Sequence, residues 1–141
     1  MYPPSAILAA GGVPPEKAWA VTGVEDLDLV PVRPAPAWMR LLWRRGTAAM
    51  TLPWAIYVDP VRLGDRELSL LILHELVHVR QWRRFGVRRF LWTYVKDYAS
   101  GRRRGLDHTA AYLGIRFERE ARMAVAKYIA ASEMSDGGPV S

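Results

Sequence analysis

The chain has 141 residues, 50% of them hydrophobic, which fits one folded domain with its own core and excludes a disordered tail. It contains no cysteine, so disulfides and thiolate zinc sites are excluded, and any metal must be held by imidazole and carboxylate groups. The net charge is +6, and the arginine clusters at residues 80–84, 88–89 and 102–104 are interpreted first as a solvated basic surface.

The first 36 residues hold seven of the ten prolines. This density predicts an extended arm or irregular packing, with one short helix around Glu16–Val21. The N-terminal apolar stretch is short, broken by proline and lacks a basic region, so it is not expected to be a signal peptide. No run of about 18 apolar residues predicts a membrane span. We therefore expect a soluble protein without a membrane partner, located in the cytoplasm or in a virion.

A different pattern begins at Trp38. Residues 38–44 and 48–52 are predicted to be strands around an Arg45-Gly46 turn, and residues 54–58 alternate as a half-buried strand should. These segments predict a small, mostly antiparallel sheet that precedes the helical part of the chain. The predicted fold class is α+β, with a Pro-rich arm at 1–36, a metal-binding domain at 37–134 and a flexible tail at 135–141.

The most apolar run of the chain, residues 68–79, predicts a central helix. Asp65 is the expected N-cap, residues 66–84 are expected to be helical, and Gly86 is well placed to end the helix. A second, amphipathic helix should follow from Val87 to about residue 100. A basic loop at 102–105 and a final helix at about 116–133 complete the prediction.

The central helix contains the motif His74-Glu75-Leu76-Val77-His78, which has the pattern HExxH. Four residues of helix advance by about 400°, so His74 and His78 leave the same face one turn apart and can hold one metal ion, with Glu75 beside them. The alternative is two hydrogen-bonded core histidines, which would need polar partners in an apolar environment. The motif favours a catalytic site with one Zn²⁺ ion per chain.

A catalytic zinc ion takes three protein ligands plus water, so a third ligand is needed. A third histidine six residues after His78 would fall at Arg84, which excludes that class of site. The remaining candidates are His108, Glu118 and Glu120. His108 follows Asp107 in a predicted loop or cap, where a hydrogen-bonded surface histidine is expected, although it could also bind metal or substrate.

Glu118 is the predicted third ligand. It shares a face of the final helix with Ala121 and Val125, and the small Ala121 allows that helix to approach the motif helix closely. Glu120 lies about 200° around the helix from this face and should point outward. An ordinary exposed helix charge is the alternative interpretation of Glu118.

The motif at 74–78, followed about forty residues later by Phe117-Glu118-Arg119-Glu120-Ala121, resembles the gluzincin pattern HExxH…ExxA of small bacterial and phage zincin-like proteins of unknown function. The order of the strand at 54–58, the motif helix and the glutamate helix also resembles them, over roughly residues 47–125. The resemblance implies a minimal zincin-like fold, with His74, His78 and Glu118 as ligands and Glu75 as general base. One departure is Arg122, which stands where many gluzincins have an aspartate that accepts from a ligand histidine. Asp97, Asp107 or a backbone carbonyl would have to replace it.

The expected chemistry is hydrolysis of a peptide bond by zinc-activated water. Glu75 would take the proton from water and deliver it to the leaving amine. Tyr112 or His108 could donate to the oxyanion. A peptide or protein substrate would align by strand addition along 48–52 or 54–58.

Two rival functions remain open at this point. The chain is small for a protease with a deep cleft, so a non-catalytic zincin-like module of a phage or secretion assembly is the main alternative, with a protein partner. Nucleic-acid binding through the arginine clusters is the third, although no recognised binding fold supports it.

Overall fold

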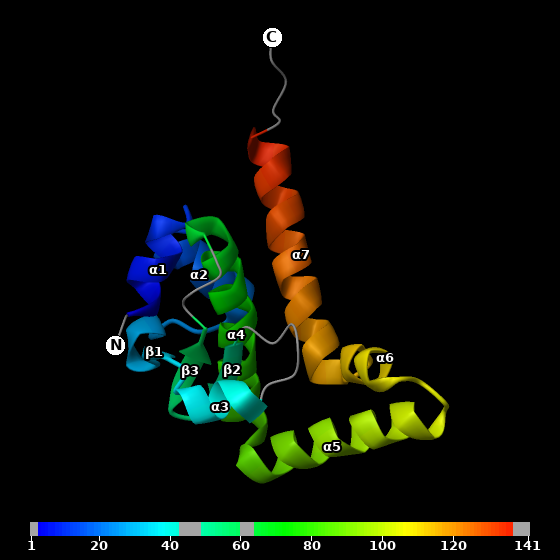
Figure 1. The fold of residues 1–141 in the computed structure, drawn as a ribbon. Coiled ribbons are helices and arrows are strands. Elements are labelled where there is room, and N and C mark those ends of the chain that lie inside the picture. The colour runs from blue at the N-terminus through cyan, green and yellow to red at the C-terminus, as the bar shows by residue number, and fades with distance from the viewer. Residues whose placement is uncertain (1–2, 43–48, 60–63, 137–141) are drawn as a thin grey trace.

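The computed structural model describes residues 3–42, 49–59 and 64–136. The apolar run at 68–79 lies in α4 (Asp65–Phe85), the helix against which the N-terminal helices, the sheet and the last helix pack (Figure 1). Ile72, Leu73 and Leu76 are fully buried and belong to the main core cluster. The prediction of a central motif helix is therefore confirmed.

The other elements surround α4. In chain order they are α1 (Pro4–Ala10), α2 (Pro15–Thr22), the 3-10 helix η1 (Leu27–Leu29), β1 (Val32–Pro34), α3 (Ala37–Leu42), β2 (Ala49–Leu52), β3 (Ala55–Val58), α5 (Val87–Arg103), α6 (His108–Leu113) and α7 (Arg116–Asp136). The predicted α+β class is confirmed. In the described part of the chain, no helix combines the length and apolarity that crossing a bilayer requires.

The N-terminal segment is folded onto α4. Its prolines begin helices instead of preventing them: Pro4 and Pro15 stand at the first helical positions of α1 and α2, where a missing N–H and a fixed φ are favourable. Leu8 and Val13 are fully buried in the main core cluster. The expected extended or irregular packing is therefore wrong for this segment, whereas the short helix expected at 16–21 is confirmed as α2.

Gly11 allows the end of α1 to approach α4 closely. A Cβ atom at this position would lie 2.1 Å from Ser69 Oγ and 2.7 Å from the Asp65 carbonyl oxygen. The Arg66 guanidinium also donates to the Gly11 carbonyl, at 3.4 Å. The contact between α1 and α4 therefore requires a residue without a side chain.

The sheet has the strand order β1-β3-β2. β2 pairs with β3 in the antiparallel sense, with Thr51 opposite Ile56, and these two strands were predicted. β1 pairs with the other side of β3 in the parallel sense, with Val32 opposite Ile56. The sheet is thus mixed and not mostly antiparallel, because a strand from the proline-rich segment completes it.

The strand predicted at 38–44 is wrong where the structure describes it, because residues 37–42 form helix α3. The Pro36 carbonyl accepts from the backbone N–H groups of Met39 and Arg40, which starts a helical turn. Trp38 and Leu41 are 62% and 84% exposed, so this apolar run does not alternate between a buried and an exposed face. The predicted Arg45-Gly46 turn lies outside the described residues.

The ends of α4 differ slightly from expectation. Its N-cap is Gly64 and not Asp65, which is instead the first helical residue and places a negative charge near the positive end of the helix dipole. Gly86 ends α4 as predicted, with φ 79°, and α5 follows at once. Arg102 and Arg103 belong to α5 and not to a loop.

The last helices follow the predicted order. Asp107 caps α6 by accepting from the Ala110 N–H at 2.8 Å. α7 begins at Arg116 as predicted and runs to Asp136. The predicted tail at 135–141 is wrong for residues 135–136, which belong to α7, and residues 137–141 lie outside the described residues.

Candidate metal centre

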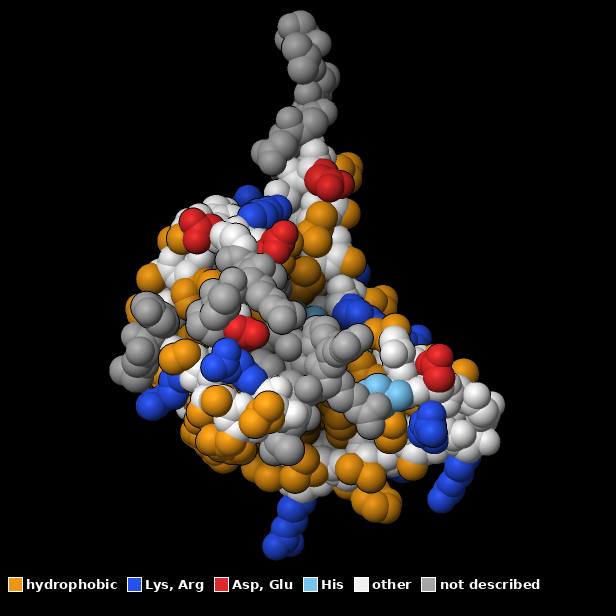
Figure 2. Space-filling model, viewed as in Figure 1, with side chains coloured by type: hydrophobic (Ala, Val, Ile, Leu, Met, Phe, Trp, Pro, Cys, Tyr) orange, Lys and Arg blue, Asp and Glu red, His pale blue; other side chains and the backbone are white. Residues whose placement is uncertain are grey.

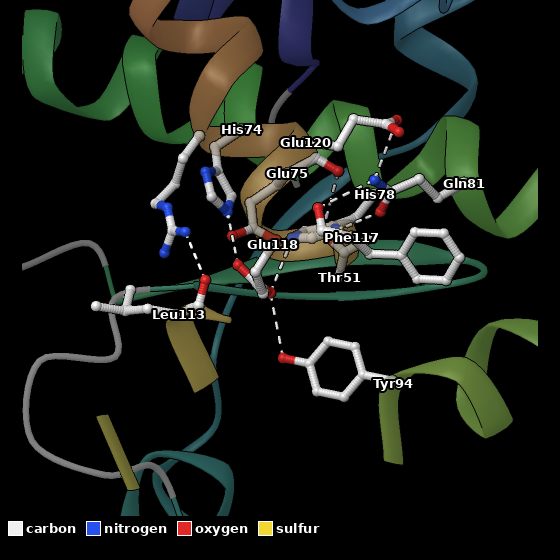
Figure 3. Close-up of polar contacts among 11 residues, drawn as sticks. Thr51, His74, Glu75, His78, Gln81, Tyr94, Leu113, Phe117, Glu118 and Glu120 are labelled. Carbon is white, nitrogen blue, oxygen red and sulfur yellow. Dashed lines mark hydrogen bonds and ion pairs between the residues drawn. The ribbon is translucent and has the colours of Figure 1, made fainter. Parts of the chain in front are cut away.

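Two elements supply a compact group of three metal-binding side chains. His74 and His78 lie one turn apart on α4, with ring centroids 5.0 Å apart, and Glu118 lies in the first turn of α7. The two carboxylate oxygens of Glu118 are each 3.1 Å from one histidine, Oε2 from His74 Nε2 and Oε1 from His78 Nε2. Figure 3 shows both imidazoles directed at this carboxylate. The structure thus brings together the three residues predicted as ligands.

The spacing of these donors could accommodate one metal ion. Zinc bonds of about 2.1 Å at tetrahedral angles place neighbouring donor atoms roughly 3.4 Å apart. The observed separations are 3.1 Å for each histidine with Glu118, and one donor atom from each residue lies within 4.8 Å of the others. Two imidazoles and a carboxylate also form a ligand set used by catalytic zinc, with a fourth position left for water. The chain's own residues therefore fit the metal.

Gln81 fixes the orientation of His78. Its Nε2 donates to the Phe117 carbonyl at 3.0 Å, so its Oε1 faces His78 Nδ1, 2.7 Å away. Because an amide oxygen can only accept, Nδ1 of His78 carries the proton and Nε2 is directed towards Glu118. Gln81 is 1% exposed and therefore performs the orienting role that ligand histidines require.

The residues considered from the sequence for that orienting role lie elsewhere. Asp97 binds Arg116 at 2.8 Å, and Asp107 caps α6. Arg122, which replaces the expected aspartate, donates to the Leu113 carbonyl and so ties α7 to the end of α6. The sequence does indicate that Gln81 lies near His78, because it follows three residues later on the same helix. The orientation of its amide, however, depends on the Phe117 carbonyl of α7, which is far away in the sequence.

Glu75 lies buried beside the donors, with 6% of its surface exposed. The Thr51 hydroxyl of β2 donates to Glu75 Oε2 and lies 3.3 Å from the Glu75 carbonyl oxygen. This contact comes from an edge strand of the sheet and orients the carboxylate from outside α4. The sequence pattern does not single out Thr51, because the contact depends on how β2 packs against α4.

Tyr94 of α5 contacts the other side of Glu118. Its hydroxyl donates to Glu118 Oε1 at 3.1 Å (Figure 3). Burial and the negative charge of Glu118 both raise the pKa of Tyr94, so the phenol stays protonated and remains a donor. The helical spacing of α5 predicts an inward position for Tyr94 but not this polar contact.

The charges of the centre stabilise each other. Burial opposes protonation of His78, but the hydrogen bond to Glu118 and the charges of Glu75 and Glu118 outweigh it and raise the pKa of His78 to about 9. Burial likewise opposes ionisation of Glu118, but the hydrogen bonds to His74 and His78 hold the pKa of that carboxyl well below its usual range. Glu118 is therefore a carboxylate at neutral pH, as a metal ligand must be.

The other predicted site residues occupy different positions. Glu120 points outward, where it pairs with Arg80 and accepts from Gln81 Nε2 at 3.3 Å. His108 lies 2.8 Å from the Tyr98 hydroxyl and is not part of the donor group. Tyr112 packs edge-on against Tyr94, with centroids 6.4 Å apart, so it reaches the neighbourhood of Glu118 next to that tyrosine. Partial burial and the charge of Glu118 raise the pKa of Tyr112, which keeps its hydroxyl a donor.

Comparisons of the chain with family models, curated proteins and solved structures found no match. The residues themselves form a group of two imidazoles and a carboxylate that could hold a metal ion, with a phenol in contact with the carboxylate and the buried Glu75 next to His74 in the sequence.

Proposed function

We propose that this protein is a gluzincin-like zinc metallopeptidase that hydrolyses peptide bonds. The main support for the proposal is that His74, His78 and Glu118 lie together in one donor group, although His74 and Glu118 are 44 positions apart in the sequence. The HExxH…ExxA resemblance and the minimal zincin-like fold that it implies belong to the same proposal. Zinc is the proposed metal because the donor set and spacing suit it.

The chain's own residues have clear parts in such a reaction. When bound, zinc supplies a Lewis acid that activates water and polarises a carbonyl. Glu75 is placed to accept the proton of the attacking water and to pass it to the leaving amine, and Thr51 holds its carboxylate in position. Tyr94 holds Glu118 by its hydrogen bond. Tyr112, next to Tyr94, is the candidate oxyanion donor, whereas His108 is engaged by Tyr98.

The proposed substrate is an extended peptide. β2 is an edge strand and carries Thr51, which contacts the general base, so a peptide added along β2 would run past Glu75. Main-chain hydrogen bonds to an edge strand hold a peptide with little side-chain selectivity. The partner is therefore a peptide or protein substrate.

The test begins with metal content. Protein purified without added metal and then offered zinc is expected to hold one ion per chain by mass spectrometry, and His78→Ala and Glu118→Ala should lose it. Glu120→Gln, which changes an outward glutamate two residues from Glu118, is the matched control and should retain the ion. A wild-type protein that binds no zinc would contradict the proposal.

Activity is tested separately, by incubating the zinc-loaded protein with a mixture of unstructured peptides and reading cleavage by mass spectrometry. Glu75→Gln should keep the zinc and lose cleavage by several orders of magnitude, because it removes the base and not a ligand. Cleavage that persists in Glu75→Gln would show that the activity arises elsewhere.

A non-catalytic zincin-like module of a phage or secretion assembly is the second candidate. The side chains of His74, His78 and Glu118 are only 19%, 7% and 6% exposed, which suits a metal that braces α4 against α7 as well as one that meets a substrate. Zinc binding without cleavage of any peptide, together with loss of stability when zinc is removed, would favour this module over the enzyme.

A further inference from the structure

Helix α5 has two distinct faces. Its inward face buries Phe90, Thr93 and Gly101. Its outward face carries Leu91, Trp92 and Val95, which are 50%, 66% and 57% exposed. At about 100° per residue these three side chains fall within an arc of roughly 100°, so they form one apolar strip along the helix.

Basic side chains accompany this strip. The exposed cations of α5 are Arg88, Arg89, Lys96, Arg102 and Arg103. The one acidic residue in α5 is Asp97, and its carboxylate is engaged by Arg116 of α7. Among the described residues, no carboxylate pairs with Arg88, Arg89 or Arg103. The outward face of α5 is therefore both apolar and strongly positive.

A second exposed apolar group lies at the same end of the molecule. Helix α3 presents Trp38 and Leu41, which are 62% and 84% exposed, and it lies at the same lower end of the view as α5 (Figure 1). Figure 2 shows hydrophobic side chains gathered along this end, with basic side chains extending beyond them. Large apolar residues exposed in such a group mark a contact surface.

We propose that the outward face of α5 binds the surface of an anionic lipid bilayer. Trp, Leu and Val on a convex helix can enter the boundary between headgroups and acyl chains, while arginine and lysine extend to the lipid phosphates. Tryptophan favours this interface because its ring is apolar and its N–H is polar. The net charge of +6 adds a long-range attraction to a negative membrane.

A bilayer suits this face better than an acidic protein does. A protein partner would need a groove that matches three protruding side chains, whereas a bilayer deforms around them. The expectation of no membrane partner was based on the lack of a spanning segment, and an interfacial helix does not need one. The proposal is independent of the proposed peptidase.

The test is flotation of the full chain with vesicles of phosphatidylcholine, with and without phosphatidylserine. Binding is expected to the vesicles that contain phosphatidylserine and to decrease with added salt. Replacing Leu91 and Trp92 together by alanine should lower the partition coefficient by about tenfold or more. Replacing Arg88 and Arg89 together by serine should have an effect of similar size.

Matched controls come from other faces. Trp19→Ala changes a tryptophan that is 50% exposed on α2, and a double replacement of Arg119 and Lys127 by serine removes two exposed cations from α7. Trp19→Ala should bind vesicles as the wild type does, and the Arg119 and Lys127 variant should lose much less binding than the Arg88 and Arg89 variant, which removes the same net charge. Circular dichroism verifies the fold of every variant. Equal losses in the control and α5 variants would overturn the proposal. The proposal would also be overturned if the wild type did not bind vesicles but bound immobilised polyglutamate through Arg88 and Arg89. That result would assign this face to an acidic protein.

Discussion

Gln81 links the two helices of the candidate metal centre through a single carboxamide. Its oxygen faces His78 Nδ1 and its nitrogen donates to the Phe117 carbonyl, next to Glu118. The same group therefore orients one ligand and helps to position the helix that carries another. Residues that orient a ligand histidine in this way affect metal affinity strongly although they never touch the metal.

Replacing Gln81 by alanine is expected to lower zinc affinity about 10- to 100-fold, because His78 loses the partner that fixes its tautomer and ring orientation. Competition with a zinc chelator measures the change. Glu120→Gln is the control, since Glu120 also contacts the Gln81 amide but lies outside the donor group. If a folded Gln81→Ala protein bound zinc with wild-type affinity, Gln81 would not have the proposed role of orienting His78.

At the scale of the elements, Asp97 of α5 binds the first residue of α7. Its carboxylate accepts from the Arg116 backbone N–H at 3.1 Å and from the Arg116 guanidinium at 2.8 and 2.9 Å. Arg116 is the first residue of α7, and Glu118 follows two positions later. A carboxylate at a helix N-terminus satisfies a free N–H and interacts favourably with the helix dipole.

Asp97→Ala should lower the free energy of unfolding at neutral pH by about 0.5–2 kcal/mol, as loss of a helix cap does. The hydrogen bonds from the Arg116 side chain, opposed by partial burial, lower the pKa of Asp97 from its ordinary value of 3.8. A lowered pKa in the folded protein means that the stabilisation is complete above this ordinary value and disappears as the pH falls through the folded value. The wild type and Asp97→Ala should therefore converge in strong acid.

Urea unfolding of both proteins across this pH range tests the prediction. Asp26→Ala is the control, because Asp26 forms an exposed ion pair with Arg83 and its side chain makes no capping hydrogen bond at the start of η1, so it should cause a smaller change at neutral pH. A difference between wild type and Asp97→Ala that persists unchanged in acid would show that the carboxylate charge is not its cause.

The contact between α1 and α4 gives a second prediction at this scale. Gly11→Ala should destabilise the protein by about 1–3 kcal/mol, because the new methyl group meets Ser69 and the Asp65 carbonyl and forces the helices apart. Thermal unfolding measures the loss. Gly114→Ala is the control, since its φ of −82° suits alanine and a Cβ there meets only carbonyl oxygens at 3.4 Å or more, so stability should change little.

For the whole molecule, a bound metal would join α4 to α7 and should stabilise the native state alone. Zinc at a free concentration one hundred times its dissociation constant is expected to raise the free energy of unfolding by about 2.7 kcal/mol. Glu118→Gln should lose this gain, and His108→Ala should keep it because His108 lies outside the donor group. Equal stabilisation of Glu118→Gln and wild type would place the zinc elsewhere.

Local interactions were predicted better than long-range ones, with the exception of Glu118, which was predicted from its face of the final helix and from the HExxH…ExxA resemblance. The spacing of His74 and His78 is local to one helix, so the sequence was enough to predict their common face. Gln81 and Thr51 depend on packing between distant segments, and neither role was predicted. In the described parts of segments 1–36 and 38–44, the expected extended and strand structure was wrong for a local reason. Pro4, Pro15 and Pro36 start helices here, whereas proline was taken as a sign of extended structure. A short apolar run also does not by itself distinguish strand from helix.

The separation of His74 and Glu118 by 44 positions also determines when, during synthesis of the chain, the three donors can come together. A ribosome adds roughly 5–20 residues per second, so a growing chain carries both histidines for about 2–8 s before Glu118, 40 positions after His78, is made. Two imidazoles alone leave half of a tetrahedral coordination shell without protein ligands. The proposed metal-dependent chemistry would therefore begin only after α7 has been synthesised and has packed against α4.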